Sequence, residues 1–97
     1  MQILSLEQGE LHVSGEIHFD NADAYYQQGL ALIRQQSLPL VINLSQLERP
    51  STLSLAVFVA WIRELPQVND LVFKAVPEKM IKILQATDLK DTLSYQH

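Results

Sequence analysis

Hydrophobic and polar residues alternate twice near the start of the chain, over residues 2–6 and again over residues 10–17. A period of two is typical of half-buried β-strands, and Glu7, Gln8 and Gly9 have the composition of a hairpin connection between them. The pattern therefore predicts that two antiparallel strands open the domain.

The spacing of apolar residues changes to a helical period after Asn21. Asp20 or Asn21 can cap a helix, and apolar or small residues then recur at the i, i+3, i+4 and i+7 positions of one face, including Tyr25 and Tyr26. This spacing predicts a helix that ends at about Gln36 and packs both tyrosines inward.

A continuous apolar run at residues 40–44 predicts a central strand that is covered on both faces, because neither side of it carries a polar stripe. Residues 45–50 are predicted to form a short polar loop. The Ser51 hydroxyl can cap a second helix, which is predicted to run to about Leu65, where Pro66 ends it.

The predicted second helix carries two apolar bands. One has the spacing of an ordinary core stripe and runs from Leu55 to Leu65. Core burial alone does not require a second band, so this band indicates a surface that a partner covers. Trp61 fits an interface anchor and packing under a terminal segment equally well. The second band consists of Leu53, Val57, Ala60 and Trp61.

The last third of the chain repeats the alternation of strand and helix. Residues 71–76 read as a strand, Pro77 suits the start of a helix, and apolar positions from Met80 to Thr87 line one side of that helix. Residues 89–97 form a tail without an assigned structure. The order β-β-α-β-α-β-α predicts a single α/β domain over residues 1–97, with a mixed sheet of four to five strands and about three helices packed on it.

Composition narrows the classes of function. The 97 residues carry 7 Lys and Arg against 11 Asp and Glu, and a net charge of −4 disfavours binding to nucleic acid. The chain has no cysteine, which excludes a disulfide framework, a thiolate nucleophile and a Cys-ligated zinc site. No apolar run approaches the ~18 residues of a membrane span, and no signal-peptide pattern opens the sequence, so a cytoplasmic domain is expected.

Few residues have the pattern of a chemical site. His12, His18 and Asp20 offer two or three metal ligands, but no further ligand has suitable spacing. Glu7 and Glu10 are predicted to be solvated carboxylates in polar surroundings. No catalytic triad or phosphate-binding glycine loop is present, so we expect a non-enzymatic domain without a metal or cofactor.

Five short segments in a fixed order resemble a STAS domain, and together they span almost the whole chain. Within that family the small STAS subunit of the Mla phospholipid-transport ABC system is the more similar type. The resemblance implies a non-catalytic binding domain. The segments are Gly15-Glu16-Ile17, residues 40–45, Ser51-Thr52, residues 71–73 and residues 83–89.

The resemblance implies docking on the ATPase subunit of an ABC transporter for phospholipids, with a role in its assembly or activity and in outer-membrane lipid asymmetry. The protein is then cytoplasmic and associates with the inner membrane through its partner complex. The surface implied is the start and exposed side of the predicted second helix, where the second apolar band also lies. Its residues are Ser51, Thr52, Leu53, Ala56, Ala60, Trp61 and Arg63.

An alternative function comes from the same family. Members that act as phosphorylation switches usually carry an Asp-Ser-Ser/Thr-Gly turn before this helix, whereas residues 51–54 here read Ser-Thr-Leu-Ser. Thr52 matches the phosphorylated hydroxyl and stays a candidate phosphorylation site. The alternative is therefore an anti-sigma-factor antagonist that acts as a phosphorylation-controlled partner switch. A homodimer through the second apolar band is expected only for the isolated chain.

Overall fold

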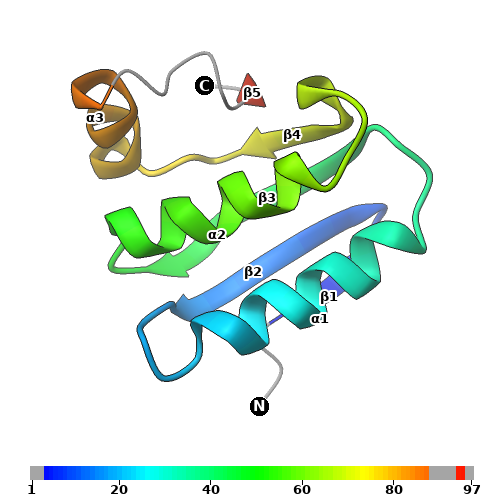
Figure 1. Cartoon of the computed structure of the whole chain (residues 1–97), viewed down its shortest axis with the longest axis horizontal. Helices are drawn as coiled ribbons and strands as arrows, with labels where there is room; N and C mark the ends of the chain where they lie inside the picture. The colour runs from blue at the N-terminus through cyan, green and yellow to red at the C-terminus, as the bar shows by residue number, and fades with distance from the viewer. Residues whose placement is uncertain (1–3, 88–93, 96–97) are drawn as a thin grey trace.

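A five-stranded mixed sheet in the order β1-β2-β3-β4-β5 forms the frame of the fold (Figure 1). The computed structural model describes residues 4–87 and 94–95. β1 and β2 are antiparallel, which confirms the predicted hairpin, and the other neighbours are parallel. The strands are β1 (Leu4–Glu7), β2 (Glu10–Glu16), β3 (Leu40–Glu48), β4 (Leu71–Lys74) and β5 (Ser94–Tyr95). The helices are α1 (Ala22–Arg34), α2 (Thr52–Arg63), α3 (Glu78–Ala86) and the 3-10 turn η1 (Val68–Asp70).

Strand β3 lies at the centre of the sheet, as its apolar run predicts, but it is longer than expected. Residues 45–48, predicted as loop, continue the strand, and Leu47 pairs with Gly15 of β2. Leu47 is buried while its polar neighbours Ser45 and Gln46 are exposed. Polar residues are compatible with this strand because one of its faces is open to solvent.

Helices α1 and α2 lie side by side on the same face of the sheet (Figure 1). The prediction that β3 is covered on both faces is therefore wrong. Ile42 and Leu44 point into the core beneath the helices, whereas Val41 and Asn43 on the other face are only half-buried. The apolar residues of β2, β3 and β4 that face the helices form one core with α1 and α2.

Helix α3 completes the core with Met80 and Leu84, both fully buried, and it contacts α2. β4 ends at Lys74, two residues earlier than predicted, and Pro77 is the N-cap of α3. Of the predicted tail, residues 94–95 pair with β4, and residues 89–93 and 96–97 lie outside the described residues. Among the helices of the described segments, none is both long and apolar enough to cross a bilayer.

Candidate protein-docking site

Helix α2 begins with a capping box formed by two serines. The Ser51 Oγ accepts a hydrogen bond from the Ser54 backbone N–H at 3.2 Å, and the Ser54 Oγ accepts one from the Ser51 N–H at 2.8 Å. These bonds satisfy backbone donors at the helix start that would otherwise need water. Ser51 is therefore the cap that the sequence predicts, and its hydroxyl is engaged within the chain.

The outer face of α2 is a stripe that we define by four residues: Thr52, Ala56 and Arg63, which are exposed, and Ala60, which is half-buried. Their spacing of four, four and three positions stacks the side chains along one side of the helix. A hollow of about 260 Å³, lined also by Leu55 and Val59, runs beside the stripe. The structure thus brings four of the seven sequence-predicted docking residues together on one surface.

The inner face of α2, defined by Val57 and Trp61, packs against α1. Trp61 is 0% exposed, and its Nε1 donates a hydrogen bond to the Tyr26 carbonyl oxygen at 3.0 Å. The indole ring lies so close to Gly29 of α1 that any Cβ added there would overlap it. Leu53 is half-buried and packs against the core. The prediction that the second apolar band faces a partner is therefore wrong for Val57 and Trp61, which α1 covers, whereas Ala60 of the same band stays at the surface.

A second, more open hollow of about 300 Å³ lies between α1 and α2. It shares Ala56 and Ala60 with the first hollow, so these two alanines form a low ridge between the hollows. Helix α1 contributes Ala22, Asp23 and Tyr26 to its lining. Sequence reasoning missed this contribution, because Ala22 and Tyr26 have the spacing of the core face and no motif sets Asp23 apart from other surface carboxylates.

Arg63 has no carboxylate within ion-pair distance among the described residues. Lys79 is the other described cation without such a partner. A guanidinium left free beside an apolar hollow can form a bidentate pair with a carboxylate of a bound protein. The cations that do have partners form the pairs Arg34–Glu64, Arg49–Glu16, Lys74–Glu10 and Lys82–Glu78.

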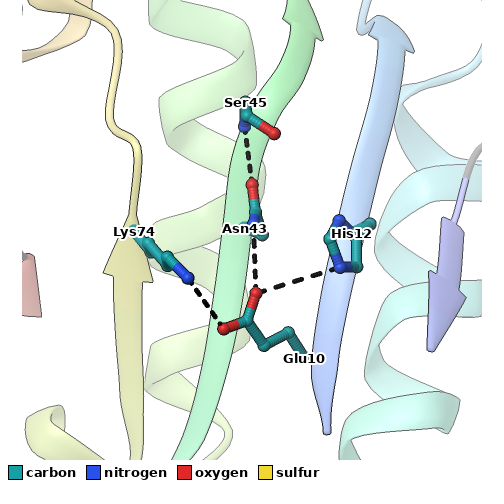
Figure 2. Close-up of polar contacts among 5 residues, drawn as sticks. All are labelled: Glu10, His12, Asn43, Ser45 and Lys74. Atoms are coloured by element: carbon teal, nitrogen blue, oxygen red, sulfur yellow. Dashed lines mark hydrogen bonds and ion pairs between the residues drawn. The ribbon is translucent and has the colours of Figure 1, made fainter. Parts of the chain in front are cut away.

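The face of the sheet opposite α1 and α2 carries a polar network centred on Glu10 (Figure 2). Asn43 and Lys74 each donate a hydrogen bond to the Glu10 carboxylate at 3.0 Å, and the His12 Nε2 lies 3.9 Å from it. The Asn43 Oδ1 in turn accepts from the Ser45 backbone N–H at 2.9 Å. The bonds from Asn43 and then Lys74 lower the pKa of Glu10 below its ordinary value of 4.5. Glu10 is thus a bonded carboxylate, not the free solvated group that was predicted.

The histidines considered as metal ligands have other neighbours. His12 lies beside Glu10, and the ring of His18, in the loop after β2, lies 3.3 Å from the Asn21 side-chain nitrogen. Within residues 4–87 and 94–95, no group of three or more His, Cys, Asp or Glu residues is placed to hold a metal ion.

The chain is similar over nearly its full length to subunits of a known assembly. A family model described as the MlaB STAS domain matches residues 3–94. Two chains in solved structures of the Acinetobacter MlaFEDB complex, in the ATP-bound Vtrans2 and Vtrans1 conformations, are 51% and 49% identical to it. In each case the match covers 98% of this chain and 100% of the other, with a TM-score of 0.88.

A third structure is more distant. An anti-sigma factor antagonist from Mycobacterium paratuberculosis is 26% identical, with 95% of this chain and 80% of that chain covered and a TM-score of 0.73. No curated protein sequence matches the chain. The fold, the order of its elements and the extent of the family match together show that the chain belongs to the MlaB type of the STAS domain family.

Proposed function

We propose that this protein is a non-catalytic accessory subunit of an ABC transporter for phospholipids and that it binds the ATPase subunit through the outer face of α2. The observation that carries this proposal is the surface stripe of Thr52, Ala56, Ala60 and Arg63, of which only Ala60 is half-buried, in a chain about half identical to a subunit of the MlaFEDB complex. The protein then lies at the cytoplasmic side of the inner membrane and supports the assembly or activity of the ATPase.

The chemistry of the outer face suits a protein partner. Two alanines present only methyl groups, so a partner helix can approach α2 closely. The hollow beside them accepts an apolar side chain, and Arg63 offers a charge-assisted hydrogen bond at its end. This combination of an apolar centre and a charged rim is typical of protein interfaces.

A single charge placed on the ridge tests the proposal. The variant Ala56→Glu puts a carboxylate at the centre of the proposed interface, where desolvation is unfavourable. We expect its affinity for the purified ATPase subunit to fall by about 30-fold or more, which corresponds to about 2 kcal/mol. Unchanged affinity would overturn the proposed docking surface.

The matched control is Ala31→Glu, which makes the same substitution at an exposed alanine of α1 that lines neither hollow. Both variants keep a good helix former, so both should fold with wild-type stability. We expect Ala31→Glu to bind the ATPase subunit as wild type does. An equal loss of affinity in both variants would indicate an effect of net charge and would contradict the proposal.

The switch function remains the alternative because Thr52 is exposed in the first turn of α2, whose N-terminus would stabilise a phosphate. The anti-sigma factor antagonist is only 26% identical to this chain, so the comparison supports the switch function less than the transporter function. Mass spectrometry of Thr52 in protein purified from its native cells decides between the two. Phosphorylated Thr52 with a co-purifying kinase or anti-sigma factor would favour the switch, whereas unmodified Thr52 with an ABC ATPase supports the proposed function.

A further inference from the structure

Phe19 is the most exposed of the large apolar side chains in the described residues. Its side chain is 90% exposed, against 38% for Leu6 and for Leu38. It lies in the loop between β2 and α1, three residues before Ala22, which lines the hollow between α1 and α2. A large aromatic side chain that is almost fully exposed, close in sequence to an apolar hollow, is typical of an interface anchor.

The loop that carries Phe19 is held in place by Asn21. Asn21 is the N-cap of α1, yet its side chain makes no hydrogen bond to the helix. Its Oδ1 accepts from the His18 N–H at 2.8 Å, and its Nδ2 donates to the Glu16 carbonyl oxygen at 2.9 Å. Of the two residues that the sequence offers as a cap, Asp20 and Asn21, the asparagine occupies the N-cap position, but its side chain ties the loop to the end of β2. An ordered loop loses little conformational entropy when a partner covers Phe19.

The outer face of α2 is too small to hold a stable partner alone. Its 12 residues give a strip about 18 Å long and about 10 Å wide. Stable interfaces bury about 800 Å² on each partner, several times the area of that strip. The partner must therefore cover neighbouring surface, and the hollow between α1 and α2 is continuous with the outer face through Ala56 and Ala60.

Unpaired charges mark the two hollows with opposite signs. Asp23 lines the hollow between α1 and α2, and Asp20 next to Phe19 is exposed. Neither carboxylate has a cation within ion-pair distance among the described residues. Arg63 lines the other hollow and has no carboxylate within ion-pair distance in the part of the chain that the structure describes. A complementary protein surface therefore presents a Lys or Arg opposite Asp23 and a carboxylate opposite Arg63.

We propose that the ATPase subunit also covers the first turn of α1 and the loop before it, with Phe19 as an apolar anchor and a basic side chain of the ATPase paired with Asp23. This inference rests on the proposed function and extends it to a second helix. The outer face of α2 and the Phe19 loop then form one continuous docking surface.

Binding of the full-length chain to the purified ATPase subunit, measured by biolayer interferometry, tests the extension. We expect Phe19→Ala and Asp23→Lys each to weaken the affinity by about tenfold or more, with the effect of Asp23→Lys decreasing at high salt. Matched controls on β1 are Leu6→Ala, another exposed large apolar residue, and Glu7→Lys, another exposed carboxylate. Both controls should bind as wild type does. Because Asp23 lies in the first turn of α1, unfolding midpoints of all variants verify that each is folded.

The outcomes separate this inference from the proposed function. Loss of binding in Ala56→Glu with wild-type affinity in Phe19→Ala and Asp23→Lys would overturn the extension and leave docking through α2 intact. Unchanged affinity in Ala56→Glu would overturn the proposed function and the extension with it. A homodimer that Asp23→Lys dissociates, without any change in ATPase affinity, would assign the α1 surface to a second copy of the chain and overturn the inference.

Discussion

The inner and outer faces of α2 both carry apolar residues in the sequence, yet the molecule treats these residues in opposite ways. The inner face carries a large side chain, Trp61, which is fully buried under α1. The outer face carries the small side chains of Ala56 and Ala60, which border two hollows. Apolar character alone therefore does not identify an interface. The size of the side chains, and what faces them, separates internal packing from a surface that another protein can cover.

The largest expected effect lies on the inner face. Trp61→Ala removes a fully buried side chain and its hydrogen bond to Tyr26, so the free energy of unfolding should fall by about 3–5 kcal/mol. Arg63→Ala, two residues later on the outer face, should change it by about 0.5 kcal/mol or less. Urea unfolding of both variants measures the difference. Similar losses would contradict the division of α2 into two faces.

Gly29 on α1 gives a second test of the inner face. Whether Gly29→Ala raises or lowers the folding stability depends on how tightly Trp61 packs against α1. Alanine is the better helix former by about 1 kcal/mol, so Gly29→Ala would stabilise an uncrowded helix. Because a Cβ there overlaps the Trp61 ring, we expect the variant to lose about 1–3 kcal/mol. Thermal unfolding shows directly whether the midpoint falls or rises. A stabilised variant would show that Trp61 does not pack tightly against α1.

Two neighbouring hydroxyls at the start of α2 have different roles: the Ser51 hydroxyl caps the helix, and the Thr52 side chain is exposed. Ser51→Ala removes the capping bond to Ser54 and should cost about 1 kcal/mol of folding stability. Thr52→Ala, at the adjacent exposed position, should change the stability by about 0.5 kcal/mol or less. Chemical denaturation of the two single variants distinguishes them. Equal losses would place a capping role on Thr52 as well.

The smallest effect belongs to the open face of the sheet. The pKa of Glu10 is lowered in the folded state, so its ionised form stabilises the fold above about pH 4.5, and this contribution is lost as the pH falls through the lowered pKa. Glu10→Gln cannot ionise. Its deficit in stability against wild type should therefore be present near neutral pH and shrink below about pH 4.5 in urea titrations. A deficit independent of pH would contradict a role for the charge.

The sequence predicts the elements well where its period is unambiguous. The hairpin, α1 and α2 follow from periods of 2 and 3.6 and from punctuation such as Pro66, and the first half of β3 follows from its continuous apolar run. The sequence predicts a loop at residues 45–48 because the polar residues Ser45, Gln46 and Glu48, which are exposed in the strand, have the composition of a loop. Gly29 in the middle of a helix was the available signal that a large ring packs there, but a single sequence does not say which ring.

The candidate site was harder to predict because its boundaries depend on contacts between distant residues. The same is true of the polar network on the opposite face of the sheet, where the bonds to Glu10 join residues 33 and 64 positions apart, which no local spacing reveals. The outer face of α2 could be predicted in part, since Thr52, Ala56, Ala60 and Arg63 share one helical stripe. Asp23 and Phe19 could not, because their importance comes from the hollow that α1 and α2 form together.

The absence of native cysteine allows a direct test of docking through the outer face of α2. Single cysteines introduced by Ala56→Cys, Ala31→Cys and Ser45→Cys sample the outer face, the exposed side of α1 and the open face of the sheet. The measurement is the rate of maleimide labelling of each variant with and without the ATPase subunit. We expect the ATPase subunit to slow the labelling of Ala56→Cys and to leave the labelling rates of Ala31→Cys and Ser45→Cys unchanged. Unaltered labelling at Ala56→Cys, or protection at Ser45→Cys instead, would contradict docking through this face.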